Sequence, residues 1–166
     1  MNRDVIARIR RTDTVYRLRV AMSNRLEKPD QMELTAPVIV EVLDNKEVLL
    51  PCGFVTDCHS VPLWLGNILP EYDNRTNIAA VVHDYLYMHW EEFAQQPGRY
   101  YVFSQMNRKY ADQVYLELMN RFHPGGWRNK LYYRAVRLFG GWNWDKYRRI
   151  NQEANEKEHE KVDQNQ

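Results

Sequence analysis

The sequence lacks most of the features that would assign it to a specialised class. Only two of its 166 residues are cysteines, Cys52 and Cys58. Two cysteines are too few for a disulfide scaffold and are not spaced as a zinc site. We therefore expect two reduced thiols, with a short-loop disulfide as the alternative. No stretch approaches eighteen apolar residues, so no membrane span is expected.

Targeting signals and a strong net charge are also missing. The first residues, MNRDVIARIRRTD, contain no apolar core of a secretion signal. The formal charge of +1 gives no electrostatic reason to expect nucleic-acid binding. In contrast, aromatic residues make up 13% of the chain, which suits a core or interface built from large side chains. The length fits one domain with a substantial core.

The first third of the chain predicts a small antiparallel meander. Residues 15–22 (VYRLRVAM) alternate in hydropathy, as expected of a half-exposed strand. Residues 23–37 predict a polar loop, and residues 38–43 (VIVEVL) a second strand. A turn at residues 44–46 leads to a third strand at residues 47–50. This part carries no obvious chemistry, so we expect a structural or docking role.

Residues 77–90 (NIAAVVHDYLYMHW) predict a helix in which apolar side chains recur at helical spacing. His83 and Asp84 interrupt this apolar run. Because consecutive helical residues point about 100° apart, these two side chains can address two neighbouring sites. Tyr87 follows one turn later and can pack beside either of them. The alternative is an ordinary helix with one hydrogen-bonded core histidine.

The loop at residues 53–62 (GFVTDCHSVP) is dense in polar side chains between apolar boundaries: Thr56, Asp57, His59 and Ser60. One interpretation is that Asp57 or Ser60 caps a short helix beginning at Pro62. The functional interpretation is that Asp57 and a neighbouring carbonyl are hard oxygen ligands beside the His-Asp helix. Calcium prefers carboxylate and carbonyl oxygens, and Asp57 and Asp84 would supply two carboxylates.

Residues 105–122 (QMNRKYADQVYLELMNRF) predict a strong helix capped by Ser104. Asp112 falls between its apolar positions, so we expect it to face the interior or a cleft, where a carboxylate needs a partner. Two partners are open. Arg108, one turn earlier, would form an ordinary helical pair. His83 would instead have one ring nitrogen fixed by Asp112, which leaves the other to activate a water.

The last third predicts one more helix and a polar tail. Residues 127–139 (WRNKLYYRAVRLF) form the helix, which ends at Gly140-Gly141 and has an apolar face made of Leu131, Ala135 and Leu138. Trp142 and Trp144 are expected to be packing anchors. Residues 145–166 predict a solvated helix or a disordered end that could order against a partner.

Together these elements predict a single α+β domain over residues 1–144, with a separate charged tail at residues 145–166. The antiparallel meander occupies residues 1–50, and the loop and three main helices occupy residues 51–144. We expect the helix that carries His83 and Asp84 to pack antiparallel to the helix that carries Asp112.

The motifs resemble those of a family of uncharacterised proteins found widely in phages and bacteria. The motifs are GFxTDxxSxP, HDxLY and RxxxD, carried here by Gly53, Phe54, Thr56, Asp57, Ser60, Pro62, His83, Asp84, Leu86, Tyr87, Arg108 and Asp112. The resemblance covers about residues 50–140 and implies no activity. It implies synthesis in the cytoplasm of a bacterial host, with phage structural proteins or further copies of the chain as candidate partners, and incorporation into a virion as one outcome.

A second resemblance is to the prokaryotic, secreted-type phospholipases A₂. The shared order is an Asp in a loop, His-Asp-x-x-Tyr on one helix and an Asp on the next. By this resemblance Asp57, Asp84 and the loop carbonyl near Cys58 match the calcium ligands. His83 matches the general base on water and Asp112 the aspartate that orients it. Supporting positions are Ser60, Tyr87 and Arg108.

In such enzymes the metal polarises an ester carbonyl while the histidine takes a proton from water, so the implied substrate is a lipid or another ester. The chain departs from this pattern in three respects. It shows no secretion signal or disulfides, its candidate calcium loop is poor in glycine, and the N-terminal meander is additional.

Two rival interpretations remain open. An HD-type metal phosphohydrolase would use His59, His83, Asp84 and Asp112 as ligands, but the interval between the two aspartates is short and His59 lies on a loop. A non-enzymatic component of a phage tail or baseplate would need no chemistry at these positions. The hypothesis taken forward is a calcium-assisted hydrolase.

Overall fold

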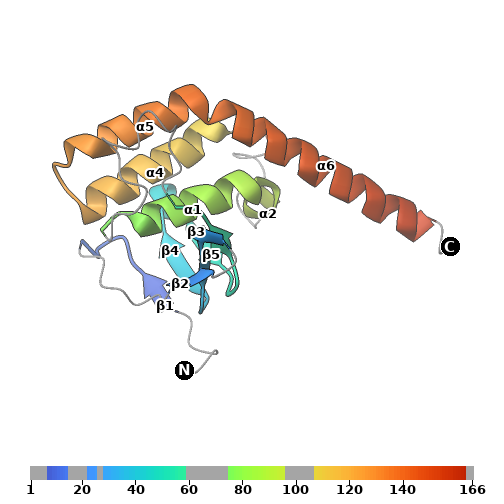
Figure 1. Ribbon diagram of the computed structural model, residues 1–166, viewed down its shortest axis with the longest axis horizontal. Helices are drawn as coiled ribbons and strands as arrows, with labels where there is room; N and C mark the ends of the chain where they lie inside the picture. Colours follow the sequence, from blue (N-terminus) through green and yellow to red (C-terminus); the bar gives the residue numbers. More distant parts are fainter. Residues whose placement is uncertain (1–6, 15–21, 26–27, 59–74, 96–106, 164–166) are drawn as a thin grey trace.

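The computed structural model describes residues 7–14, 22–25, 28–58, 75–95 and 107–163. They form an α+β fold with the strands on one side and the helices on the other (Figure 1). The predicted fold class is therefore confirmed. Among the described helices, none is both long enough and apolar enough to cross a bilayer.

The strands form two small sheets, with the orders β1-β4-β5 and β2-β3-β6. Their bounds are β1 Ala7–Ile9, β2 Met22–Arg25, β3 Lys28–Leu34, β4 Val38–Glu41, β5 Glu47–Leu50 and β6 Val55–Thr56. Strand β1 is parallel to β4, whereas the other pairs are antiparallel. A short 3₁₀ helix, η1 (Leu43–Asn45), joins β4 to β5.

The predicted single meander is wrong in two respects. Its sheet contains a parallel pair, β1 with β4. In addition, the predicted polar loop at residues 23–37 contains β3 and most of β2. The second error arises because β3 pairs with β2 on one side and with β6 on the other, and such pairing can hold a polar segment in a strand despite its composition. Most of the strand predicted at residues 15–22 lies outside the described residues.

The helices are α1 Asn77–Met88, α2 Trp90–Gln95, α4 Arg108–Phe122, α5 Trp127–Phe139 and α6 Gly141–Asp163. The three main predicted helices are present as α1, α4 and α5. Helix α4 begins at Arg108, later than predicted, and the side chain of Asn107 caps it by accepting from the Tyr110 amide. The predicted cap, Ser104, lies outside the described residues. Helix α6 continues without a break through residue 145, where the sequence analysis starts the tail.

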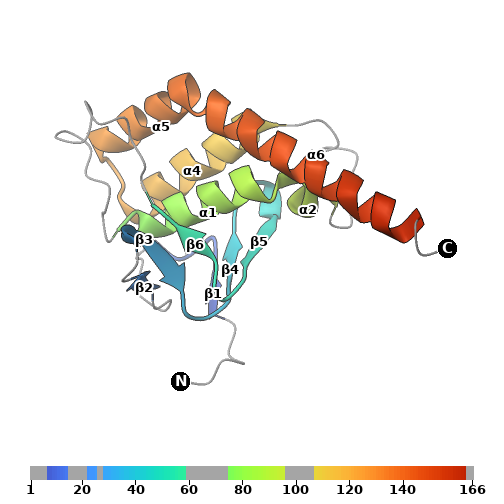
Figure 2. The same ribbon diagram turned by 45° about the vertical axis from the view of Figure 1, so that its right-hand side comes forward.

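Helix α1 is the centre of the molecule. All but two of its residues are buried, with strands on one side and α4 and α6 on the other (Figures 1 and 2). Helix α4 runs antiparallel to α1, because the ring of His83 contacts that of Tyr115, whereas Trp90, further along the chain, contacts the earlier Tyr110. This places His83 and Asp112 opposite each other.

The outer face of α5 and the start of α6 differ from prediction. Leu138 is 76% exposed and Trp142 is 72% exposed, whereas Trp144 is buried as predicted. The buried residues of α5 are Asn129, Tyr132 and Ala135. Apolar residues occur on more than one side of α5, so periodicity alone did not identify the side that packs.

Candidate functional site

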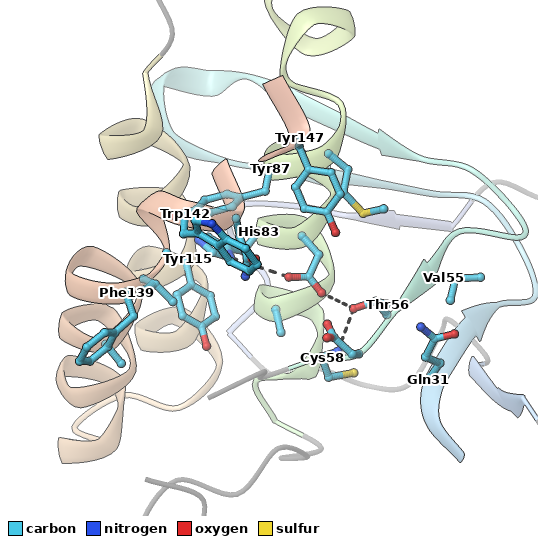
Figure 3. A pocket seen from close by; sticks show the side chains of 18 residues that line it. Gln31, Val55, Thr56, Cys58, His83, Tyr87, Tyr115, Phe139, Trp142 and Tyr147 are labelled. Atoms are coloured by element: carbon cyan, nitrogen blue, oxygen red, sulfur yellow. Dashed lines mark hydrogen bonds and ion pairs between the residues drawn. The ribbon is translucent and has the colours of Figure 1, made fainter. Parts of the chain in front are cut away.

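A pocket of about 500 Å³ lies where the strand β6, the loop after it, α1, α4 and the α5–α6 junction meet (Figure 3). One part of its lining is polar and consists of Thr56, Asp57, His83 and Asp84. Another part is apolar or aromatic and includes Tyr115, Val136, Phe139, Trp142 and Tyr147. The pocket therefore combines titratable groups with a wall suited to an apolar ligand.

His83 is buried and held in one orientation. Its Nε2 lies 2.9 Å from Oδ1 of Asp112. Because an ionised carboxylate only accepts hydrogen bonds, Nε2 carries the proton and Nδ1 of the neutral ring holds a lone pair. The rings of Tyr87 and Tyr115 pack against the imidazole at centroid distances of 4.2 and 4.7 Å. The structure thus realises the His83–Asp112 pairing and leaves Nδ1 on the side of Asp84.

Asp112 is fully buried and accepts from three donors. Besides His83, the Tyr87 hydroxyl donates to Oδ1 at 2.7 Å, and Nη1 of Arg137 donates to Oδ2 at 2.6 Å. Burial alone would raise the pKa of Asp112, but the bonds from His83, Arg137 and Tyr87 outweigh it and lower the pKa. Asp112 is therefore ionised at neutral pH.

Arg108 does not fill the role of helical partner to Asp112 that the sequence left open. Its guanidinium donates to the carbonyls of Val136 and Arg137, at 3.3 and 3.2 Å. These carbonyls belong to the last turn of α5, where few backbone donors remain; the Val136 carbonyl also accepts from the amide of Gly140 at 2.8 Å. Arg108 thus secures the turn that presents Arg137 to Asp112. Nothing in the sequence pattern singled out Arg137, which lies on a different helix from Asp112.

Gly140 allows the close approach of the α5–α6 junction to this network. A Cβ atom added there would lie 2.7 Å from the Tyr87 hydroxyl oxygen and 2.5 Å from the carbonyl oxygen of Val136. Both separations are shorter than any real contact of a Cβ atom. Gly140 does more than end a helix, as its sequence context predicts, because a side chain there would displace the hydroxyl that binds Asp112.

Asp84 lies on the other side of His83. Its Oδ1 is 3.9 Å from Nδ1 of His83, and its Oδ2 accepts a hydrogen bond from the Thr56 hydroxyl. The same hydroxyl oxygen accepts from the amide of Cys58 at 2.9 Å, so the loop after β6 is tied to α1 (Figure 3). Cys58 has a φ of 58°, a left-handed conformation that non-glycine residues seldom adopt.

Asp57 and Asp84 influence each other electrostatically. Burial and the negative charge of Asp57 raise the pKa of Asp84, and the nearby His83 and the hydrogen bond from Thr56 only partly oppose them. Burial lowers the pKa of His83, but the hydrogen bond to Asp112 and the charges of Asp112 and Asp84 outweigh it, so the pKa of His83 is raised. The polar side of the pocket thus brings two carboxyl groups, those of Asp57 and Asp84, close to His83.

The polar side of the pocket carries two carboxylates. Asp57 and Asp84 both line the pocket and supply oxygen atoms of the kind that calcium prefers. Over the described ranges, no set of three His, Cys, Asp or Glu side chains is arranged to hold an ion. A cation here would complete its shell with backbone carbonyls and water. His59 and Ser60 lie outside the described residues, and Cys52 and Cys58 are free thiols.

These features define an α+β protein with a buried, oriented histidine beside an acidic pocket. The model of a family described as Protein of unknown function (DUF1353) matches residues 32–136, so the chain belongs to this family. The match confirms the expected membership of an uncharacterised family. No curated protein and no solved structure matched the chain.

Proposed function

We propose that the chain is a calcium-assisted hydrolase of the phospholipase A₂ type, acting on an ester with an apolar part. The observation that carries the proposal is the geometry of His83. One ring nitrogen is bound to the buried Asp112, and the other lies 3.9 Å from a pocket carboxylate, Asp84. A histidine held in this way can take a proton from a water in the pocket.

The proton transfer depends on three side chains. His83 accepts the proton at Nδ1, and the imidazolium that forms is stabilised by the charge of Asp112 at Nε2. Arg137 and Tyr87 keep Asp112 ionised, so the proton on Nε2 stays with the ring. The separation of 3.9 Å between Nδ1 and Asp84 exceeds a direct hydrogen bond and suits one oxygen atom that contacts both.

The acidic side of the pocket supports a role for a cation. Asp57 and Asp84 would hold it, with the carbonyl of Cys58 as a further ligand. Calcium bound there would polarise the ester carbonyl and stabilise the developing oxyanion. The left-handed backbone at Cys58 is consistent with a loop shaped for a purpose other than packing.

The apolar wall supports the choice of substrate class. Val136, Phe139 and Trp142 belong to the apolar part of the lining. An acyl chain would gain free energy by leaving water for such a wall, at about 25 cal/mol for each Å² buried. A small polar ester would gain little from it.

The contacts of Asp112 argue against the HD-type alternative. Such an enzyme would need His83, Asp84 and Asp112 as ligands to the metal. Here Oδ1 and Oδ2 of Asp112 are both engaged by donors, and Nε2 of His83 is engaged by Asp112. A metal ligand must offer a lone pair, but Nε2 of His83 carries a proton and three of the four acceptor sites of the Asp112 carboxylate are already used.

The test is hydrolysis of fluorogenic phospholipids and esters in the presence of calcium or a chelator. His83→Asn should lower kcat/KM at least about 100-fold, because general bases contribute about 10²–10⁴-fold. His89→Asn is the matched control, since His89 lies on the same stretch of chain but pairs with Glu92, and it should retain activity. Asp57→Asn should abolish a calcium-dependent activity and would spare an HD-type one.

Equal activity in the two histidine variants would refute the role of His83. If the wild-type chain hydrolyses no ester or phospholipid with calcium or manganese, the hydrolase proposal fails. The remaining alternative is then a structural component of a virion. It predicts that the chain associates with tail or baseplate proteins and that Asp57→Asn does not weaken this association.

A further inference from the structure

Helix α5 and the first turns of α6 carry charge of almost one sign. Residues 127–150 contain seven basic residues and one acidic residue, although the whole chain carries only +1. Two of the basic side chains, Arg137 and Arg148, are paired with Asp112 and Glu91. The other five are exposed: Arg128, Lys130, Arg134, Lys146 and Arg149. This segment is therefore a region of positive potential.

The same segment also exposes most of the large apolar side chains that the described residues leave in water. Trp127, Leu138 and Trp142 are 62%, 76% and 72% exposed, and Phe139 and Ile150 are also exposed. Outside residues 127–150, only Leu49 has comparable exposure among the described large hydrophobic residues. Monomeric proteins seldom gather such side chains in one place unless the surface binds something.

Helical spacing puts apolar and basic side chains on the same outer stripes. Trp127, Arg134 and Leu138 are seven and four residues apart, so they share one side of α5. Trp142, Lys146 and Arg149 share one side of α6 in the same way. Both helices lie beyond α1 and α4 on the side away from the strands (Figures 1 and 2), and α5 packs inward through Tyr132 and Ala135.

We propose that these six residues, named here the α5–α6 outer surface, bind an anionic lipid bilayer. Tryptophan side chains favour the interface between headgroups and acyl chains, and a helical face that combines apolar and basic residues lies in that interface. Each Lys or Arg near an anionic membrane adds an attraction that salt weakens. The surface provides both kinds of side chain: tryptophan and leucine for the lipid interface, and lysine and arginine for the anionic headgroups.

Other occupants fit the surface less well. In a symmetric contact with a second copy, the exposed basic residues would face one another across the interface, and like charges repel. Nucleic acid would use the basic residues through its phosphates, but it offers no partner for Leu138 and Ile150. An anionic bilayer satisfies the charged and the apolar residues together.

The surface adjoins the mouth of the pocket, since Phe139 and the exposed Trp142 belong to its lining (Figure 3). Bilayer binding would hold that mouth against lipid. This consequence rests on the proposed function, whereas binding itself does not require hydrolysis. A separate binding measurement therefore distinguishes failure of one proposal from failure of the other.

The experiment is co-sedimentation with vesicles in the presence of a chelator, so that calcium cannot bridge protein and lipid. Vesicles of phosphatidylglycerol mixed with phosphatidylcholine should bind the chain, and vesicles of phosphatidylcholine alone should not. The double variant Arg134→Gln/Arg149→Gln should lower the partition coefficient roughly 20-fold, because each basic residue contributes about fivefold. The matched control Lys109→Gln, an exposed residue of α4, should bind as the wild type does.

The apolar contribution is tested with Trp127→Gln/Leu138→Gln, for which we expect at least about a tenfold loss. Its control is Leu49→Thr, the exposed apolar residue on β5. Asp84→Asn should bind vesicles normally, because it lies outside the surface. Melting temperatures check that each variant folds, and the salt dependence of wild-type binding gives a readout that needs no variant.

Four outcomes would overturn the inference: no binding to anionic vesicles, binding that salt does not weaken, binding lost equally in the control variants, or binding to a single-stranded oligonucleotide as strong as to vesicles. A wild-type dimer that Trp127→Gln/Leu138→Gln converts to a monomer would assign the surface to a second copy and would also overturn it. If the chain binds vesicles but hydrolyses nothing, this inference stands and the proposed function fails.

Discussion

Replacement of Asp112 by asparagine is the sharpest test of the buried network. Asparagine keeps the shape of the side chain but removes its charge and turns one acceptor into a donor. Oδ1 receives His83 and Tyr87, and Oδ2 receives Arg137. The least costly orientation keeps the oxygen at His83 and Tyr87 and points the amide at Arg137, whose side chain is 32% exposed and can turn to water.

The magnitude follows from these contacts. Breaking a fully buried ion pair costs about 3–5 kcal/mol, but the partly exposed Arg137 contributes at the level of a surface pair, below about 1 kcal/mol. We therefore expect Asp112→Asn to lower the free energy of unfolding by about 3 kcal/mol. For a chain of this size that corresponds to a drop of about 10 °C in Tm.

Two further measurements distinguish the loss of these particular contacts from a non-specific destabilisation of the fold. The raised pKa of His83 should fall, because burial would act without the opposing charge of Asp112. Histidine resonances in NMR titrations report it directly. Because the pKa of Asp112 is lowered from 3.8, the wild type gains stability above that pH and loses it as the pH falls through the lower, folded pKa. The variant should lack this loss.

The control is Asp145→Asn, the same change at an exposed position of α6, which should alter stability by less than about 0.5 kcal/mol. The reasoning is refuted if Asp112→Asn has the same melting temperature as Asp145→Asn and leaves the pKa of His83 unchanged.

Two other predictions concern the edges of the site. Gly140→Ala should destabilise the protein by about 1–3 kcal/mol and displace the Tyr87 hydroxyl, because the new methyl group collides with it. The control is Gly141→Ala, whose Cβ has an ordinary 3.4 Å contact and which should be nearly neutral. Equal melting temperatures of the two variants would contradict the packing argument. Burial raises the pKa of Cys58 to about 12, so iodoacetamide at pH 8 should label the exposed Cys52 alone in the folded protein. Labelling of both thiols at similar rates, read by mass spectrometry, would show that the loop opens.

Local periodicity predicted that His83 and Asp112 face inward, but it left the partner of Asp112 open between Arg108 and His83. Apolar spacing fixes which side of α1 and α4 is buried, and His83 and Asp112 interrupt the apolar runs of their helices. The position of Tyr87, one turn after His83, follows from the same spacing, and its hydroxyl does reach Asp112. The sequence therefore indicated three residues of the network, but not that both His83 and Tyr87 bind Asp112.

The remaining members depend on tertiary packing. Arg137 reaches Asp112 only because α5 packs on α4, and Gly140 matters only because Tyr87 approaches it. The strand β3 pairs with β2 on one side and with β6 on the other, which its polar sequence does not indicate. Trp142 looked like a packing anchor, but its neighbour Trp144 takes the buried position. Such features arise from neighbours distant in the sequence.

The most direct test of the central claim is calcium titration calorimetry on the wild type, Asp84→Asn and Asp145→Asn. The wild type and Asp145→Asn should bind calcium and gain in Tm, and Asp84→Asn should do neither. Without metal, Asp84→Asn should melt at or above the wild-type temperature at pH 7, because the raised pKa of Asp84 means that its ionised form costs stability there. If the wild type binds neither calcium nor manganese, or if Asp84→Asn binds as tightly as the wild type, the metal-assisted site is contradicted.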